Sequence, residues 1–223
     1  ILKTKKIKII RNGVDLELLQ SPKFNFKNEN KIEGRILLFV GRFDYVKGID
    51  ILLDGFSKIC FEEEFLDVKL VIMGSDFGFK NKMMKLIKEK GIEHRIKIIE
   101  NPLRDEVISA YHSAEFLVLP SRWELSPLTP LEGFACKKTV ISCNVAGIPH
   151  VIKNEKNGIL IESENSSDLA KSIRKLLKNE NFCKNLSIEG FKEIQDELNS
   201  KFMVKQFLKT YGEMIEKYKK YSC

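Results

Sequence analysis

The stretch RILLFVGRFDYVKGIDILLDGF, residues 35–56, joins an apolar run, a glycine turn and the start of an amphipathic segment. The apolar run, 35–40, has the composition of a buried strand, and apolar side chains then recur at helical spacing over 48–59. A strand that leads into a helix is the repeating unit of a parallel sheet, because parallel neighbours need a crossover between them. The stretch therefore predicts an α/β fold.

The same alternation continues along the chain. Apolar runs of strand length recur at 68–73, 95–100, 115–120, 138–142 and 158–162. Segments with helical spacing, such as 79–91, lie between them. We therefore expect a doubly wound parallel sheet of the Rossmann-like type, with helices on both faces. In such sheets, ligands bind beyond the carboxyl ends of the strands.

The length and composition fit a single domain. The chain has 223 residues, of which 43% are hydrophobic, and this is enough for a substantial core. We expect one domain over 1–223, with a core at about 35–180 and C-terminal helices over 181–223. A short strand at 7–10 and a polar connection are expected to precede the core.

The C-terminal part of the chain is helical in pattern. Ser166 or Ser167 is expected to cap its first helix. The last segment has an apolar stripe that consists of Val204, Phe207, Leu208, Tyr211, Ile215 and Tyr218. We expect this stripe to pack either against its own domain or against a partner domain that the sequence lacks.

The charge of the chain favours an anionic ligand without identifying it. The 38 Lys and Arg residues exceed the 31 Asp and Glu residues, which gives a formal net charge of +7. The lysines are spread along the chain, and no basic run is interleaved with aromatic residues as a base-stacking surface would need. We therefore do not expect nucleic acid as a partner.

Cysteine spacing and hydropathy indicate a cytoplasmic protein. The five cysteines are scattered and lack any C-x-x-C spacing, as expected of reduced thiols and not of a disulfide framework or a zinc site. No apolar run approaches the roughly 18 residues of a membrane span, and the opening residues lack the order of a signal peptide. The first residue is not methionine, so we expect a piece of a longer protein.

Two basic residues follow the strand at 35–40. Gly41 allows a tight turn there, and Arg42 and Lys47 place two cations where a doubly wound sheet binds its ligand. Guanidinium and ammonium groups suit a diphosphate, including one that gains charge as a leaving group. The alternative is a turn with two solvated basic residues. The turn lacks the G-x-G-x-x-G dinucleotide fingerprint.

The stretch ELSPLTPLE, 124–132, contains two glutamates with seven residues between them. Pro127 and Pro130 exclude a single helix that includes both glutamates. We expect the helix to begin late, with Thr129 as N-cap and Pro130 at the first helical position. Glu132 would then complete a capping box.

This helix start leaves two roles open for each glutamate. Its free amide groups favour a phosphate, and Glu132 can either close the cap or accept the hydroxyl groups of a ribose beside that phosphate. Glu124 has no helix to cap. It is either a solvated loop carboxylate or a ligand for a hydroxyl group at the strand edge.

Other strand ends add turns but no metal site. In NVAGIPHVI, 144–152, Gly147 and Ile148 either offer backbone amides to a ligand or form a plain tight turn. The three histidines are scattered and no D-x-D pair occurs, so we expect neither a metal nor another cofactor.

Several motifs occur together in one order along the chain. They are RNGVD, FVGRFDYVKGIDILLDGF, LVIMGS, AEFLVLPSRWE, the paired glutamates of ELSPLTPLE, NVAGIPHVI and NGILIE. In this order, over residues 7 to about 180, they resemble the C-terminal donor-binding domain of retaining glycosyltransferases with two Rossmann-like domains. This group, the GT-B type of glycosyl transferases group 1, includes sucrose synthases and, more distantly, glycogen synthases.

The resemblance implies an enzyme that transfers a hexosyl group from a nucleotide-diphosphate sugar, with retention and without a metal. The acceptor would be a sugar or a lipid-linked molecule, and the latter would place the protein at the inner membrane face. The N-terminal acceptor domain of the family is absent, so this half alone is expected to be inactive. In the family, the final helix crosses back to that first domain.

The resemblance also assigns residue roles. Arg42 and Lys47 match the basic pair on the diphosphate, and Gly41 shapes their turn. Glu132 matches the glutamate that holds the ribose hydroxyls, and Glu124 matches the carboxylate near the donor sugar. The catalytic residues implied are Glu124, Arg42 and Lys47.

The remaining donor contacts implied are mostly made by the backbone. Thr129, Pro130 and Leu131 match the loop whose amides meet the phosphates. The base would lie near Asn101 and Leu103.

The chain departs from the family pattern at four positions. Leu125 and Pro127 replace glycines between the glutamates, Arg11 replaces a proline, and Pro102 replaces a glycine near the base. We expect the bulkier loop to affect which sugar is accepted.

Other functions on the same architecture remain as alternatives. They are a sugar-nucleotide epimerase, a glycan phosphorylase and a non-catalytic nucleotide-sugar-binding module. An epimerase needs an acid/base pair and a phosphorylase needs a cofactor lysine, and the sequence offers neither.

Overall fold

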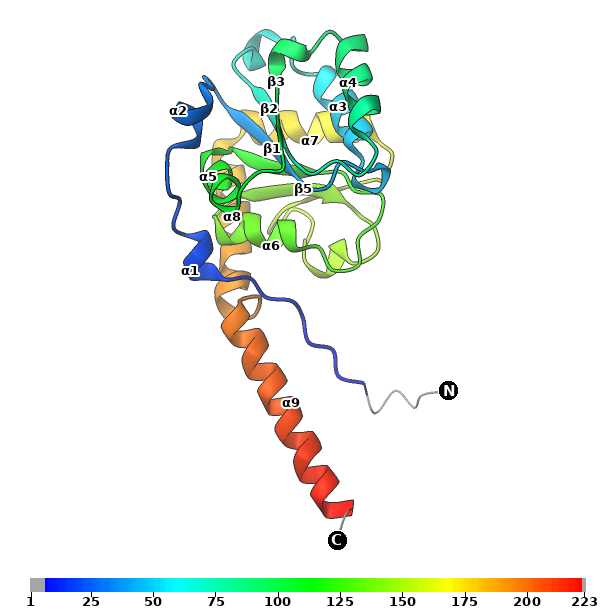
Figure 1. The fold of residues 1–223 in the computed structure, drawn as a ribbon. Coiled ribbons are helices and arrows are strands. Elements are labelled where there is room, and N and C mark those ends of the chain that lie inside the picture. The colour runs from blue at the N-terminus through cyan, green and yellow to red at the C-terminus, as the bar shows by residue number, and fades with distance from the viewer. Residues whose placement is uncertain (1–6, 222–223) are drawn as a thin grey trace.

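Parallel strands form a six-stranded sheet at the centre of the molecule, in the order β3-β2-β1-β4-β5-β6 (Figure 1). The strands are β1 (Ile36–Val40), β2 (Lys69–Gly74), β3 (Ile96–Glu100), β4 (Phe116–Leu119), β5 (Thr139–Cys143) and β6 (Ile159–Ile161). The computed structural model describes residues 7–221, so most of the opening segment that was compared with a signal peptide, at 1–6, and the last cysteine, at 222–223, lie outside the described residues. The predicted doubly wound parallel sheet is confirmed.

Helices cover both faces of the sheet. The longer helices are α1 (Leu16–Leu19), α2 (Phe26–Asn30), α3 (Ile49–Ser57), α4 (Lys80–Glu89), α5 (Arg104–Ser113), α6 (Leu128–Ala135), α7 (Ser166–Lys178), α8 (Glu180–Asp196) and α9 (Ser200–Tyr221). Single 3-10 turns are η2 (Tyr45–Lys47), η3 (Glu63–Phe65), η4 (Glu93–Arg95) and η5 (Ile148–His150). Helices α3, α4 and α7 pack on one face, and α5 and α6 pack on the other.

The strand order reverses between β1 and β4. From β1 the chain moves outward to β2 and β3, and from β4 it moves outward the other way to β5 and β6. Adjacent strands whose crossovers leave in opposite directions open a crevice at their carboxyl ends. This switch point is where the segments after β1 and β4 meet.

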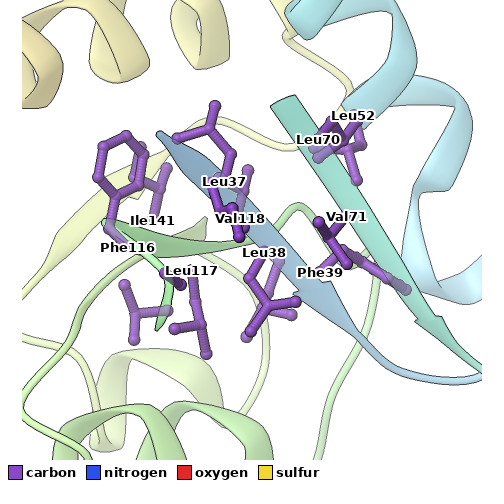
Figure 2. Close-up of a cluster of buried hydrophobic side chains, with 14 of the residues drawn as sticks. Leu37, Leu38, Phe39, Leu52, Leu70, Val71, Phe116, Leu117, Val118 and Ile141 are labelled. Atoms are coloured by element: carbon purple, nitrogen blue, oxygen red, sulfur yellow. The ribbon is translucent and has the colours of Figure 1, made fainter. Parts of the chain in front are cut away.

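The core explains why the strands are continuous apolar runs. Figure 2 shows side chains on both faces of the sheet, including Leu37, Leu38 and Phe39 of β1 and Phe116 and Leu117 of β4. All five are buried. A strand that is covered on both sides has no polar face, so its sequence does not alternate.

The expected strand at 7–10 is wrong. These residues are irregular, and pairing in this part of the chain begins with the isolated bridge between Val14 and Asn199. The run has β-branched residues but pairs with none of the six strands, and an unpaired segment gains nothing from a strand conformation.

The cap of α7 also differs from the expectation. Asn165, and neither Ser166 nor Ser167, is the N-cap, and its side chain accepts from the amide of Asp168 at 2.9 Å. Ser166 instead donates to Asp54. The tertiary contact with α3 therefore shifts the cap by one residue.

Helix α9 extends away from the domain (Figure 1). Its apolar stripe is exposed, at Val204, Phe207, Leu208, Tyr211, Ile215 and Tyr218. The expectation that the stripe packs against its own domain is therefore wrong. No helix among the described residues is both long and apolar enough to cross a membrane.

Candidate functional site

The segments after β1 and β4 bring together two residues that the sequence singled out. Lys47 and Glu124, 77 residues apart in the chain, form an ion pair at the switch point. The side chains are 18% and 19% exposed, so the pair is largely shielded from water. Ser121 adds a hydrogen bond of 3.3 Å from its hydroxyl to Glu124. The two side chains, which the sequence assigned separately to the carboxyl ends of two strands, therefore meet in the folded chain.

A tight turn directs Lys47 toward Glu124. The carboxylate of Asp44 accepts from the amide of Lys47 at 2.9 Å and so caps η2. Gly48 then joins η2 to α3 with a φ of 66°, in the left-handed region. A Cβ atom at Gly48 would lie 2.0 Å from the carbonyl oxygen of Pro120. The turn therefore packs backbone against backbone at the end of β4.

Arg122 fastens the two segments, and the sequence analysis did not identify it. Its amide donates to the carbonyl of Val46 at 2.7 Å, and its guanidinium donates to Asp50 at 2.8 and 3.1 Å. The guanidinium also lies over the ring of Tyr45, at 3.8 Å. Burial alone would raise the pKa of Asp50, but the hydrogen bonds from Arg122 lower it overall. Asp50 therefore stays ionised and holds Arg122 in place.

Helix α6 begins two residues earlier than the sequence predicted. Pro127 is the N-cap and Leu128 is the first helical residue, so the expected cap at Thr129 is wrong. Pro130 lies at the third position, where the amide that proline lacks would have no intrahelical partner. The capping box of Glu132 is consequently also wrong. No side chain among the described residues caps this helix end.

The uncapped end of α6 and the ion pair share one narrow recess. The recess is lined by Val40, Lys47, Leu119, Ser121, Glu124, Pro127, Thr129, Pro130, Ser142 and Ile148. A cation, a carboxylate and a helix N-terminus therefore face the same small space. The positive end of the helix dipole and the ammonium together favour an anionic group there.

Glu132 points elsewhere, toward α5. Its Oε1 accepts from Arg104 at 2.7 Å, and its Oε2 accepts from the hydroxyl of Tyr111 at 2.7 Å. Tyr111 is fully buried; burial first and the nearby carboxylate second raise its pKa well above the ordinary value. Asn101 and Leu103, the expected base contacts, directly precede Arg104. The structure thus links Glu132 to the segment after β3.

Arg42 lies at the rim and not in the recess. Its guanidinium is 3.0 Å from the carboxylate of Asp44 and 5.1 Å from the ring centre of Phe77. Its side chain is 54% exposed. The preceding residue, Gly41, lies against the end of β2. A Cβ atom at Gly74 would lie 1.8 Å from the carbonyl oxygen of Gly41.

The turn at 144–148 supports the site, and the two amides that the sequence singled out, those of Gly147 and Ile148, are already engaged. The amide of Gly147 donates to the carbonyl of Glu124 at 2.7 Å, and the amide of Ile148 donates to Val145 at 3.0 Å. The hypothesis that these amides bind a ligand is therefore wrong, and the plain tight turn is confirmed. The bond from Gly147 fixes the loop that carries Glu124.

The thiols are not part of this site. Cys60, Cys136 and Cys143 are buried and free, and burial raises the pKa of the Cys136 and Cys143 thiols to about 12. Among the described residues, no group of three or more His, Cys, Asp or Glu side chains could hold a metal ion. The absence of a metal and the cytoplasmic location both stay predictions.

Known proteins resemble this chain in sequence. The sequence profile of the family described as glycosyl transferases group 1 matches residues 20–193. An uncharacterized glycosyltransferase of Methanocaldococcus jannaschii is 33% identical over 208 residues, which are 93% of this chain and 54% of that protein. The chain spans about half the length of the curated relatives it matches.

Solved structures resemble the chain in fold. The sucrose-phosphate synthase of Thermosynechococcus elongatus superposes with a TM-score of 0.84 at 24% identity, over 94% of this chain and 53% of that one. The Anabaena protein HepE in complex with UDP-glucose superposes with a TM-score of 0.84 at 18% identity, over 95% of this chain and 58% of that one.

Proposed function

The chain belongs to the family of glycosyl transferases group 1, and from this premise we propose that it binds a nucleotide-diphosphate sugar as the donor half of a retaining hexosyltransferase. The observation that carries the proposal is the recess at the switch point, where Lys47, Glu124 and the uncapped end of α6 converge. The fold is shared with a protein solved with UDP-glucose. The acceptor would be a sugar or a lipid-linked molecule.

The groups around the recess suit the diphosphate and the sugar of such a donor, which would lie over the recess because its own volume is only about 10 Å³. The ammonium of Lys47 and the amides at the start of α6 would neutralise the phosphates as the bond to the sugar breaks. Glu124 would accept hydrogen bonds from sugar hydroxyls. Because Arg42 is exposed and held only at Asp44 and Phe77, its side chain can turn from the rim toward the phosphates.

The ribose would bind at Glu132. Both of its oxygens already accept hydrogen bonds, one from the fixed, buried Tyr111 and one from Arg104. Arg104 is 46% exposed, so it is the partner that a ribose diol would displace or share. The base would then lie along the segment from Asn101 to Leu103.

The half of the curated relatives that this chain does not span would correspond to the acceptor site. The chain corresponds to about half of its relatives, and its exposed α9 stripe has the apolar character of a surface that packs against another domain. Transfer would require both halves, and this half alone would bind the donor without turning it over.

Donor binding should raise the thermal stability of the chain. At a hundredfold excess over Kd, the ligand that fits should stabilise the folded state by about 2.7 kcal/mol. For a chain of this length, that corresponds to a rise in Tm of roughly 5–10 °C. The measurement is a thermal melt with UDP-, GDP- and ADP-sugars, with the free sugar and the nucleoside as controls. If none of the three donors moves the Tm of the folded chain, the donor-site proposal fails.

Replacing Glu132 with glutamine should weaken nucleotide binding with little loss of stability. Glutamine cannot offer two charged acceptors to the ribose hydroxyls, so the Kd should rise roughly tenfold. Its amide oxygen can still accept from the hydroxyl of Tyr111, so the free energy of unfolding should fall by only about 1 kcal/mol. Calorimetric titration and chemical denaturation measure the two effects.

The matched control for this change is Glu189→Gln. Glu189 is a carboxylate on α8 that pairs with Lys192 at the surface. Its substitution should leave both the Kd and the stability near the wild-type values. An unchanged Kd in Glu132→Gln would rule out the ribose role.

A further inference from the structure

A second cavity opens at the edge of the sheet opposite the donor recess. Its volume is about 390 Å³, and it lies at the amino ends of β1, β4 and β5. The ends of α5 and α7, the segment that follows α6 and the first half of α8 complete its walls. The volume falls within the range of small-molecule sites. Donor chemistry in this fold takes place at the other edge, so this cavity is a separate site.

The cavity carries an excess of positive charge. Its charged lining consists of Arg35, Lys137, Lys138 and Lys184 against Glu115 and Glu180. The guanidinium of Arg35 is already engaged with Asp67, at 2.7 and 2.9 Å. Lys137 lies over the ring of Phe191, at 4.8 Å. The lysines at 138 and 184 are thus the cations available to a ligand.

Lys138 is the residue that most requires a partner. It is partly buried, and its amide donates to the carbonyl of Gly133 at 2.8 Å, but its ammonium makes neither a hydrogen bond nor an ion pair within the described part of the chain. Burial lowers the pKa of its ammonium, and the more distant charge of Glu115 offsets this only in part. A shielded ammonium without a counter-charge costs free energy that a bound anion would recover.

We propose that this cavity binds a small phosphate monoester that carries hydroxyl groups. The phosphate would lie against Lys138 and Lys184, where ammonium groups donate charge-assisted hydrogen bonds. Glu115 and Glu180, on the same lining, would accept from the hydroxyl groups. Inorganic phosphate should bind more weakly than the monoester because it lacks those contacts.

The test is calorimetric titration of the full chain with glycerol 3-phosphate, inorganic phosphate and glycerol. We expect the first to bind best and glycerol not to bind. Lys138→Met should raise the Kd for glycerol 3-phosphate at least about tenfold, as the loss of a charge-assisted hydrogen bond implies. Lys171→Met, the same change on the exposed surface of α7, should leave the Kd unchanged.

Two further variants distinguish binding in this cavity from binding at the donor site and from a loss of folding. Arg42→Ala at the donor rim should not affect this binding; if it abolishes binding while Lys138→Met does not, the ligand occupies the donor site and the proposal is overturned. No binding to the wild type also overturns it. Should Lys138→Met fail to fold by circular dichroism, the exposed Lys184→Glu decides, since it must weaken binding as well.

Discussion

Replacing Gly48 with alanine is expected to lower the free energy of unfolding by about 4 kcal/mol. A φ of 66° costs an L-residue roughly 1–2 kcal/mol. The added Cβ would also lie 2.0 Å from the carbonyl oxygen of Pro120, so the turn or the end of β4 must move. For a chain of this length the loss corresponds to a fall in Tm of roughly 8–16 °C. Chemical denaturation and thermal melts both measure it.

Gly91→Ala is the matched control. Gly91 has nearly the same φ, 63°, but no described atom lies within 4 Å of its added Cβ. It should therefore lose only the backbone cost, roughly 1–2 kcal/mol. Equal losses in the two variants would show that the approach of the turn to β4 is relaxed without cost. Because Gly48 directs Lys47, the first variant should also weaken nucleotide binding and the control should not.

The sheet could be predicted because burial on both faces leaves a mark in each strand. The runs that begin at Ile36, Leu70 and Phe116 are apolar throughout, since neither side of the strand meets water. The run at 7–10 has a similar composition but pairs with no strand of the sheet. Composition reports the preference of a segment and not whether a partner is within reach.

The placement of Lys47 and Glu124 at one edge of the sheet could be predicted for a topological reason. Parallel strands end on one edge, so residues that follow β1 and β4 are brought close whatever the intervening sequence. The position of Lys47 and Glu124 at this edge could therefore be predicted without knowing any side-chain contact. Arg122 and Tyr111 were missed because their roles depend on partners 72 and 21 residues away, and no local pattern marks such pairs.

The predicted start of α6 was wrong for a local reason. The capping-box pattern favoured Thr129 and Glu132. It contains no information about Tyr111 and Arg104, which donate hydrogen bonds to the same carboxylate. Once Glu132 is held by α5, it cannot bond back to the helix start. The helix then begins at Leu128 with its amides uncapped, which leaves that end open to an anion.

Replacing Lys47 with alanine is expected to weaken the binding of a nucleoside diphosphate by roughly a hundredfold. The loss combines a charge-assisted hydrogen bond with a partly shielded attraction, together about 2.7 kcal/mol. The change also leaves Glu124, 19% exposed, without its cation, so the free energy of unfolding should fall by about 1–2 kcal/mol. Titration calorimetry with UDP, GDP and ADP gives the first value, and denaturation gives the second.

A double variant separates the two consequences of losing Lys47. In Lys47→Ala with Glu124→Gln, no unpaired carboxylate remains, so stability should recover while binding stays weak. Lys201→Ala is the control, because Lys201 pairs with Glu17 at a site where both side chains are 80% exposed. It should change neither quantity measurably. If Lys47→Ala binds nucleotide as tightly as the wild type, the pair with Glu124 only fastens the loop, and the diphosphate must lie elsewhere.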